Sequence, residues 1–553
     1  MNKNYSNKPR IAYFCMEFGL NEKLPLYAGG LGVLAGDYLK AAKKLDAPVV
    51  GLGIRWWQDY THQYINEDGY PYDTFPIMEL DFLKDTKKSI TIQIQGQDVK
   101  CDIKKVDNFN NAPLYLLDPG RPESDNGWIS DQLYVGNSQE RIAQEILLGI
   151  GGIRALRALN IEVDKYHFNE GHAAFAGFEL IREKMDNKNL SFEKALNKTQ
   201  KEIIFTTHTP VEAGNESHNI ESLKNMGATH YLNNDQIQRI GGDPFNMTAA
   251  CLKMSSVANG VSDLHRETAK DMWDDIENTA PILGITNGVN IETWQHPDIQ
   301  TAFDNNNKED LWNVHKNLKQ ELTDFISDNS NVKMNPDNLI IGFARRAAPY
   351  KRSELIFRDT DQIDDYLKSG KLQLVFSGKA HPEDNYGKEI VAQLVKMDEK
   401  YKNSIAFLEN YDMEIARYLV RGCDVWLNNP KRPLEASGTS GMKVAMNGGL
   451  NLSVLDGWVA EGIDHGTHGW IFDELFSEFD ETLGEDEKDL KALYKIIRNE
   501  VIPTYYENRE KWLDMMYASI EMSHHQFSAA RMLKEYYEKM YSKSVSESEL
   551  LKK

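Results

Sequence analysis

The sequence predicts an α/β protein with two doubly wound, Rossmann-like domains that face a central cleft. Short apolar runs rich in Val, Ile and Phe recur along the chain, as parallel strands covered on both faces require. Segments with helical spacing separate these runs, which indicates repeated βα units. The length of 553 residues exceeds what one hydrophobic core normally serves, so two domains are expected.

In the first half, the expected strands lie in IAYFCME, PVVGLGI and IIFTTHTP, and AGDYLKAAKKL has the spacing of a helix. The segment SITIQIQGQDVKCDIKK alternates with period two around a polar GQD. This pattern predicts an antiparallel hairpin, inserted near residues 61–118. We expect the first domain to span residues 1–295.

In the second half, the expected strands lie in NLIIGFARR, LQLVFSGKA, SIAFLEN, DVWLNN and LNLSVLDG. The polar, Asn/Asp-rich residues 296–338 form the expected crossover, and the second domain would span residues 296–484. Residues 485–553 read as a helical tail. Its apolar residues Met532 and Leu533 fall on one side, so we expect the tail to pack back on the first domain.

The composition argues against several partners and sites. The net charge is −21, with 84 acidic residues against 63 Lys and Arg, which disfavours nucleic acid and anionic membranes as partners. The four cysteines are far apart without a CxxC, and no metal-ligand spacing occurs, so we expect no bound metal. No signal peptide or membrane-spanning stretch is evident, and a cytoplasmic location is expected.

Four motifs fall at the ends of expected strands or the starts of helices. The first is YAGGLGVLAGDYL, in which Gly29, Gly30 and Gly32 precede a helix. Unpaired N–H groups and the helix dipole favour an anion at such a place. The match to a dinucleotide fingerprint is poor, and a tight turn into a helix explains the glycines about equally well.

The second motif is GFARRAAPYKRS, which follows an expected strand. Arg345, Arg346, Lys351 and Arg352 crowd into eight residues, and such crowding is costly unless an anion neutralises the charges. Arg and Lys both suit phosphate. A solvated basic loop is the simpler alternative.

The third motif is EASGTSGMK. Glu435 can accept hydrogen bonds from hydroxyl groups, while Ser437, Gly438 and Thr439 offer donors. Lys443 lies one turn further on. It could bind a phosphate electrostatically or form a Schiff base with a carbonyl cofactor, and an ordinary helix start with an exposed lysine is the simpler alternative.

The fourth motif pairs HFNEGHAAF with TTHTPVEAG. A histidine after a strand, such as His172 or His208, is more often structural than catalytic, although Asn169, Glu170 and His172 together could bind a polyol. From the residues alone, the reaction therefore stays open.

Taken in order, these pieces resemble the α-glucan (glycogen, starch and maltodextrin) phosphorylases. The resemblance is carried by GGLGVLAGDYL, NEGHAAF, TTHTP, TNGV, RRAAPYKR, GKAHP, ENYDMEIA, EASGTSGMK and NGGLNLSVLDG, from about residue 11 to about residue 460. The chain is most similar to the short bacterial or archaeal type. We expect it to lack the regulatory N-terminal extension of long animal members.

The resemblance implies a GT-B glycosyltransferase architecture and an enzyme that uses pyridoxal 5′-phosphate. The enzyme would cleave α-1,4-glucan or maltodextrin with inorganic phosphate and release glucose 1-phosphate with retention. Lys443 would hold the cofactor as an internal Schiff base. Thr439, Gly29, Gly30 and Lys351 would surround or neighbour the cofactor phosphate, and Tyr411 would lie near the cofactor. Arg346 would bind the substrate phosphate, with Lys351 as a second candidate. Asn287, His172, Glu435, Ser437 and Gly438 would hold the terminal glucosyl ring, and the implied catalytic residues are Arg346, Lys351 and His172.

The chemistry that the resemblance implies gives Lys443 a chemical role. The Schiff base anchors the ring, and the 5′-phosphate relays a proton towards the glycosidic oxygen. Two phosphates in contact repel unless they share a proton and are neutralised, which the basic cluster would do. The same cations would stabilise an oxocarbenium–phosphate pair, so no carboxylate nucleophile is required.

Some features depart from the family or stay open. Ala348 and Pro349 stand where long members carry a His-Glu pair, which puts the contacts of those side chains in doubt. The role of the basic residues in NNPKRPLEASG is open. A homodimer is expected from the family, but the sequence does not fix the oligomeric state.

Three alternatives compete with this hypothesis. A nucleotide-sugar-dependent glycogen or starch synthase shares the architecture, but it leaves Lys443 without a covalent role, and Ala28 stands where synthases place a lysine. A catalytically inactive glucan-binding protein is disfavoured by the intact Arg346, Lys351 and Lys443. A pyridoxal-phosphate aminotransferase would leave the basic cluster unexplained.

Overall fold

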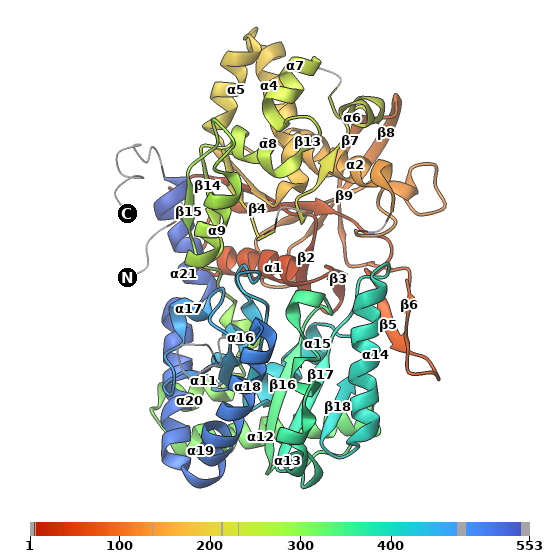
Figure 1. Ribbon diagram of the computed structural model, residues 1–553. Coiled ribbons are helices and arrows are strands. Elements are labelled where there is room, and N and C mark those ends of the chain that lie inside the picture. The colour runs from red at the N-terminus through yellow and green to blue at the C-terminus, as the bar shows by residue number, and fades with distance from the viewer. Residues whose placement is uncertain are drawn as a thin grey trace. The chain divides into compact units, whose positions relative to one another are not determined.

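The computed structural model divides the chain into two compact units (Figure 1). It describes residues 5, 7–134, 136–211, 214–229, 232–472 and 483–542. The first unit comprises Met1–Tyr60, Phe75–Asn287 and Ala529–Lys553, and the second comprises Thr61–Thr74 and Gly288–Ser528.

The units differ from the expected domains in three places. The main boundary falls between Asn287 and Gly288, a few residues before the expected 295/296. Thr61–Thr74 belongs to the second unit although its neighbours in sequence belong to the first. The expected tail is divided at Ser528, since the residues before this point pack in the second unit. Residues 543–553 lie outside the described residues.

The described part of the first unit holds a nine-stranded sheet with the order β15-β14-β11-β10-β1-β4-β9-β8-β7. The strands from β15 to β9 are parallel to their neighbours. In chain order these parallel strands follow the doubly wound pattern, and the switch point lies between β1 and β10. The strands are β1 (Ile11–Phe14), β4 (Val49–Ile54), β7 (Lys84–Ile94), β8 (Gln97–Val106), β9 (Leu114–Asp118), β10 (Lys165–Asn169), β11 (Ile203–Thr206), β14 (Val257–Gly260) and β15 (Ile282–Gly284).

The predicted antiparallel hairpin is confirmed as β7 and β8. Ile94 pairs with Gln97, and Ile92 pairs with Val99. From Ile90 to Ile94 and from Val99 to Ile103 every second residue is buried, as the period-two pattern requires. The pair extends the parallel sheet because β8 runs antiparallel to β9.

The tail of the chain contributes to the core of the first unit. Met532 and Leu533, on the last α-helix, are buried in the same hydrophobic cluster as the sheet. The hydroxyl of Tyr541 lies 2.7 Å from that of Tyr38 and 2.6 Å from Nδ1 of His167. The helices are α1 (Gly30–Lys44), η1 (Gly127–Ile129), α2 (Ser138–Ile146), η2 (Leu147–Gly151), α3 (Gly152–Ala158), η3 (Gly171–Ala173), α4 (Ala174–Lys188), α5 (Phe192–Gln200), α6 (Ile220–Met226), α7 (Asn234–Gly241), α8 (Met247–Met254), α9 (Asp263–Trp273), α21 (Ala529–Tyr536) and η10 (Tyr537–Tyr541). Two short antiparallel pairs complete the unit: β2 (Phe18–Asn21) with β3 (Leu24–Leu26), and β12 (Ser217–His218) with β13 (Phe245–Asn246).

The second unit is built on a six-stranded parallel sheet with the order β18-β17-β16-β19-β20-β21. In chain order this is 3-2-1-4-5-6, the doubly wound pattern, with its switch point between β16 and β19. All five strands that the sequence predicts here are present. The strands are β16 (Leu339–Ala344), β17 (Leu372–Ser377), β18 (Ile405–Leu408), β19 (Val425–Asn428), β20 (Leu450–Ser453) and β21 (Gly469–Ile471), and the unit also holds the antiparallel ribbon β5 (His62–Ile65) and β6 (Pro71–Thr74).

The polar crossover expected at residues 296–338 is largely helical. Its long helix α12 (Lys308–Asn329) buries Leu311, Leu318 and Leu322 at helical spacing, which explains how a polar segment joins the core. The other helices are α10 (Ile291–Trp294), α11 (Pro297–Asp304), η5 (Pro349–Lys351), η6 (Leu355–Phe357), η7 (Thr360–Gln362), α13 (Asp364–Lys368), α14 (Asn385–Lys400), α15 (Met413–Gly422), α16 (Thr439–Ala445), α17 (Val459–Gly462), α18 (Glu485–Ile496), η9 (Ile497–Val501), α19 (Ile502–Glu507) and α20 (Arg509–Gln526). Within the described ranges, no helix has the length and apolar character that a bilayer crossing demands.

Candidate active site

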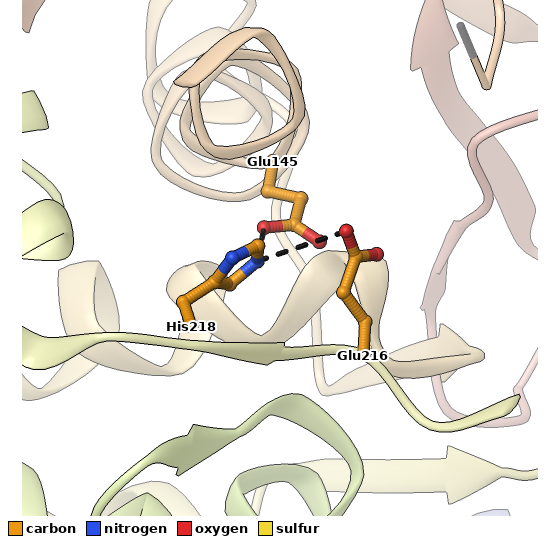
Figure 2. A group of neighbouring side chains, drawn as sticks. All are labelled: Glu145, Glu216 and His218. Atoms are coloured by element: carbon orange, nitrogen blue, oxygen red, sulfur yellow. Dashed lines mark hydrogen bonds and ion pairs between the residues drawn. The ribbon is translucent and has the colours of Figure 1, made fainter. Parts of the chain in front are cut away.

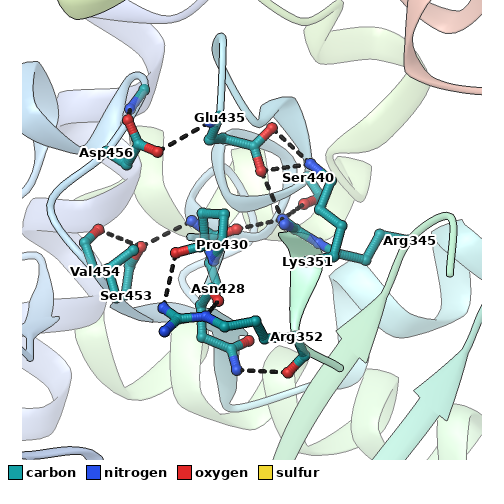
Figure 3. A network of polar contacts seen from close by, with 12 residues as sticks. Arg345, Lys351, Arg352, Asn428, Pro430, Glu435, Ser440, Ser453, Val454 and Asp456 are labelled. Carbon is teal, nitrogen blue, oxygen red and sulfur yellow. Dashed lines mark hydrogen bonds and ion pairs between the residues drawn. The ribbon is translucent and has the colours of Figure 1, made fainter. Parts of the chain in front are cut away.

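In the second unit, the carboxylate of Glu435 lies between two cations of the loop that follows β16 (Figure 3). Lys351 Nζ donates to Oε1 at 2.7 Å and to Oε2 at 2.5 Å, and Arg345 Nη1 donates to Oε2 at 2.9 Å. Burial opposes ionisation of Glu435, but the charges of Lys351 and Arg345 outweigh it and lower its pKa. Part of the anion that the basic cluster needs is therefore supplied by the chain itself.

Arg345 also joins the two strands at the switch point. Its Nη2 donates to the side-chain oxygen of Asn428 on β19 and lies 3.4 Å from Oγ of Ser440. Trp426 Nε1 donates to the same Oγ at 3.1 Å. Arg345 Nε is buried and has no hydrogen-bond partner in the described part of the chain. This arrangement fixes the guanidinium at the carboxyl end of the sheet.

Arg346, the next residue, behaves differently. It is exposed, and the described residues give it no hydrogen bond or ion pair. Of the cations in the motif, it is thus the one left available for an external anion.

The remaining basic residues near the motif have a structural role. Arg352 contacts Asp486 at 2.8 Å and Asp489 at 2.7 Å, both on α18. Arg432 contacts the other oxygen of Asp489 at 2.8 Å. These contacts tie α18 to the loops after β16 and β19, which accounts for Arg432 in the NNPKRP segment.

Lys443 is buried on α16, which begins at Thr439. Its Nζ lies 3.9 Å from the centroid of the Trp294 ring, a cation–π contact. Gly438 precedes the helix with φ of 86°, a conformation that favours glycine. Ser437 is buried, and its Oγ has no partner among the residues described.

Tyr411 follows β18 and lies within electrostatic range of Arg345. Burial raises the pKa of Tyr411, and the positive charge of Arg345 opposes that rise. The phenol therefore stays neutral and can act as a hydrogen-bond donor at this edge of the sheet.

In the first unit, the residues that follow β10 lie at the switch point of that unit's sheet. His172 lies on η3, with its ring centroid 5.6 Å from that of Tyr134. Its Nδ1 is buried and, within the described residues, unpartnered. Burial, aided by the charge of Arg141, lowers the pKa of His172 to about 4. The imidazole is thus neutral and can exchange hydrogen bonds with a hydroxyl group.

One ring nitrogen of His208, from the TTHTP motif, is hydrogen-bonded within the protein and is therefore not available to a ligand. Its Nε2 lies 2.7 Å from Oδ1 of Asn169. Burial lowers the pKa of His208 to about 3, so the ring is neutral. Asn169 in turn donates from Nδ2 to Sγ of Cys15 at 3.3 Å, which links the ends of β1, β10 and β11.

The glycine turn before α1 is partly occupied by a side chain of the protein. Oε2 of Glu17 accepts hydrogen bonds from the N–H groups of Ala28 at 2.7 Å and Gly29 at 3.1 Å. For Gly29 the hydrogen-bond acceptor in the structure is thus the carboxyl group of Glu17, and a ligand anion at this turn stays a prediction. A Cβ added at Gly29 or Gly30 would meet no atom within 4 Å among the described residues beyond its own neighbours in the chain and helix, so there is room beside this backbone.

Asn287, at the end of the TNGV motif, is held by its backbone. Its N–H donates to the carbonyl of Val261 at 3.1 Å, and its own carbonyl accepts from Arg531 Nη2 at 2.9 Å. The side-chain Oδ1 is buried and finds no partner in the ranges that the structure describes. The residue therefore presents an amide oxygen that no described residue satisfies.

Figure 2 shows a cluster that the sequence did not predict: the buried Glu145 on α2 and His218 on β12, with the partly buried Glu216 before that strand. His218 Nε2 lies 2.8 Å from Oε2 of Glu145. Arg141 donates to both oxygens of Glu216, at 3.1 and 2.7 Å. The three possible ligand atoms lie within 4.8 Å of one another, as a metal site would require.

The charges of this cluster balance without a metal ion. Arg141 offsets Glu216, and one proton shared by Glu145 and His218 leaves the group neutral. Burial, with the charge of Glu216, raises the pKa of Glu145 to about 8, in keeping with a retained proton. No sequence motif marks the cluster because Glu145 and His218 are 73 residues apart.

Comparisons with known proteins place these residues in a family. A family model for carbohydrate phosphorylases matches residues 299–472. The maltodextrin phosphorylase of Thermococcus litoralis is 39% identical over 98% of this chain and 72% of its own length. The glycogen phosphorylase of Aquifex aeolicus is 34% identical over 98% of this chain and 87% of its own.

One archaeal relative has nearly the same length as this chain. An uncharacterized protein of Methanocaldococcus jannaschii is 33% identical over 96% of this chain and 99% of its own. The resemblance drawn from the motifs is confirmed. The chain belongs to the carbohydrate phosphorylase family, in its short prokaryotic type.

Proposed function

We propose that this protein is an α-glucan phosphorylase. It cleaves the α-1,4 bond at the non-reducing end of a glucan or maltodextrin with inorganic phosphate, and it releases glucose 1-phosphate with retention. Relatives similar over almost the whole chain include a maltodextrin phosphorylase and glycogen phosphorylases, which supports the proposal.

The observation that carries the proposal is a set of three buried polar atoms without partners among the described residues. They are Oδ1 of Asn287, Oγ of Ser437 and Nδ1 of His172. Leaving a buried polar group unsatisfied costs about 1–3 kcal/mol, so such groups usually have a ligand to bind. All three belong to residues for which the resemblance implies contacts with sugar hydroxyls.

The residues present also fit pyridoxal phosphate. Lys443 offers a buried primary amine, the group that bonds an aldehyde, and the Trp294 ring beside it shields the amine from water. Thr439 begins α16, where a hydroxyl and helix N–H groups suit a phosphate. The resemblance implies Gly29 and Gly30 as further contacts; within the first unit the backbone there has room beside it, and the N–H of Gly29 is bonded to Glu17. When bound, the cofactor supplies a phosphate that can hold a proton beside the substrate.

The charges after β16 suit a second phosphate, that of the substrate. Arg345, Arg346 and Lys351 carry three positive charges, and Glu435 offsets one of them. The remaining two positive charges match a phosphate of charge about −2. Arg346 is the exposed member and binds the incoming phosphate, while Lys351 and Arg345 are held in place by Glu435.

Glu435 has a further role in the proposal, because a carboxylate locked by two cations is a fixed acceptor for sugar hydroxyls. Ser437 and Gly438 follow it and complete this contact. Ala348 and Pro349, which replace a His-Glu pair of long members, put no charge between Arg346 and Lys351. The GT-B architecture and a homodimer stay predictions from the family.

A direct assay tests the proposed function. Purified full-length protein is incubated with maltoheptaose and inorganic phosphate, and glucose 1-phosphate is followed with a coupled enzyme assay, with its anomer read by NMR. We expect α-glucose 1-phosphate from the wild type and none from Lys443→Ala. Glucosyl transfer from UDP-glucose or ADP-glucose without phosphorolysis would instead establish a nucleotide-sugar-dependent synthase.

A further inference from the structure

Glu170 has an unusual backbone conformation at the end of β10. Its φ is 75° and its ψ is 170°. This region of conformational space is essentially reserved for glycine, because a Cβ meets the backbone there. Such strain persists where the surroundings enforce it, and it concentrates at sites that bind ligands.

The Glu170 side chain shows what enforces the strain. Oε1 accepts hydrogen bonds from the N–H of His208 and from Oγ1 of Thr209, the latter at 3.1 Å. Oε2 accepts from the N–H of Gly171 at 3.3 Å. The N–H of Glu170 itself donates to the carbonyl of Thr206 at 2.9 Å. The residue is 7% exposed, so water does not compete with these bonds.

These bonds join two neighbouring strands at the edge where doubly wound folds bind ligands. The carboxylate starts from the end of β10 and reaches the loop after β11, and the Asn169 contact with His208 runs alongside it. Together they fix the turn from β10 into η3 against the next loop of the sheet.

The strained residue leads directly into the short helix that carries His172. Glu170 precedes η3, which begins with Gly171, followed by His172. Gly171 packs closely on the start of α8, since a Cβ on it would stand 3.1 Å from Cβ of Met247. His172 is thereby held with its Nδ1 buried and, among the residues described, unpartnered.

A purely structural turn does not explain the choice of glutamate. Glycine adopts this backbone conformation without strain, and the chain places a glycine at the next position. Glutamate adds what glycine lacks, a carboxylate that ties the turn to His208 and Thr209. The hydrogen bonds of the carboxylate thus fix the turn and hold Glu170 in its strained conformation.

We propose that Glu170 is a positioning residue that fixes His172 for binding the terminal glucosyl ring. Glu170 itself does not touch the substrate. The inference rests on the proposed phosphorylase function and adds a residue to it.

Two variants separate the backbone from the side chain. Glu170→Gly removes the strain together with the carboxylate, while Glu170→Gln keeps the strain and one carbonyl acceptor but loses the bond from Gly171. Asn189→Gly is the matched control, because Asn189 is exposed at the end of α4 and also has a positive φ, 47°. The KM for maltoheptaose, the KM for phosphate, kcat and the melting temperature are measured for each.

We expect Glu170→Gly to raise the KM for maltoheptaose by about tenfold or more and to leave the KM for phosphate within about twofold. Glu170→Gln should show a smaller rise, about threefold, as partial rescue by the conservative change. Asn189→Gly should leave every kinetic constant unchanged. If Glu170→Gly does not fold, the inference is tested by Glu170→Gln alone, and it requires that the KM of this variant for maltoheptaose rises.

An unchanged KM for maltoheptaose in the folded variants, with a lower melting temperature, would overturn the inference and make Glu170 a structural residue. A parallel rise of both KM values would overturn it as well, because a positioning role towards the sugar is selective. Failure of the wild type to release glucose 1-phosphate would instead refute the proposed function, so the two failures are distinguishable.

Discussion

Nζ of Lys351 lies 2.7 Å from Oε1 of Glu435, and both side chains are buried in the second unit. The lysine comes from the loop after β16 and the glutamate from the segment after β19, so the pair spans the switch point of the sheet. An ion pair in this position holds the basic loop and the segment before Lys443 in a fixed relation.

Removing one member of this pair should destabilise the protein strongly. Glu435→Gln leaves Lys351 and Arg345 buried without their counter-charge, and breaking a buried ion pair costs about 3–5 kcal/mol. Lys351→Met should also be destabilising, whereas the double variant should lose less than the sum of the two. Denaturant unfolding followed by tryptophan fluorescence measures the midpoints. Strictly additive losses would show that the pair is not coupled.

Arg346→Ala should impair phosphate use without affecting stability. The side chain is exposed and has no hydrogen bond or ion pair with the described residues, so its loss should remove only the phosphate contact that we propose. We expect the KM for phosphate to rise by about tenfold or more, with an unchanged melting temperature. Lys431→Ala is the control, since it removes another exposed positive charge from the same unit. Equal effects of the two variants would mean that the overall field, rather than Arg346, matters.

Ser437→Ala should separate stability from binding. Because the buried Oγ has no partner in the described part of the chain, its removal should leave stability unchanged or raise it by up to about 1 kcal/mol. The KM for maltoheptaose should rise by about tenfold, since the variant lacks the hydroxyl that we propose contacts the sugar.

The control for this variant is Ser519→Ala. Ser519 is a buried serine of α20 whose Oγ donates to the carbonyl of Gly449 at 3.0 Å. Its removal should cost about 1 kcal/mol in stability and leave the KM unchanged. A loss of stability in Ser437→Ala would show that its hydroxyl is satisfied within the folded chain.

The Glu145–His218 pair should make stability depend on pH. Folding raises the pKa of Glu145 to about 8, mainly through burial, and the bond to Glu145 raises that of His218 against the effect of burial. The folded pair therefore keeps one proton up to about pH 8, whereas the unfolded chain loses its histidine proton near about pH 6.5. Because the folded state binds the extra proton, its stability falls as pH rises between these values.

The expected loss is about 2 kcal/mol between about pH 6.5 and 8, at about 1.4 kcal/mol per pKa unit. Unfolding midpoints measured across this range give the slope. Glu145→Gln leaves Arg141 and Glu216 balanced beside a neutral His218, so this variant should lack the slope. A metal-dependent gain in the melting temperature of the wild type would mean that an ion, not a proton, balances the cluster.

The strands were the most predictable part of the fold. β16 to β20 are buried on both faces and read as continuous apolar runs, so their residues identify them. In the two main sheets, the strands that were not predicted are β9 (LYLLD), β10 (KYHFN), β14 (VANG), β15 (ILG) and β21 (GWI). The last three are runs of three or four residues that contain glycine, and such runs carry little pattern. The division of the helical tail at Ser528 depends on tertiary packing that periodicity does not report.

The motifs of the candidate site were visible in the sequence, but their contacts were not. The crowded cations pointed to an anion, and the structure supplies part of it as Glu435, more than 80 residues away in the chain. The N–H of Gly29 pointed to an anion as well, and Glu17 reaches it from the start of β2. Both pairings depend on which strands become neighbours, which the local sequence does not encode.

The central claim is that Lys443 carries pyridoxal phosphate. Purified wild-type protein and Lys443→Ala are each treated with borohydride, digested and analysed by mass spectrometry, while a second aliquot is treated with acid to release free cofactor. The account predicts a phosphopyridoxyl group on the peptide that contains Lys443, about one pyridoxal phosphate per wild-type chain, and no modified peptide from the variant. Wild-type protein that carries no pyridoxal phosphate after incubation with it, or a modified peptide that does not contain Lys443, would contradict the account.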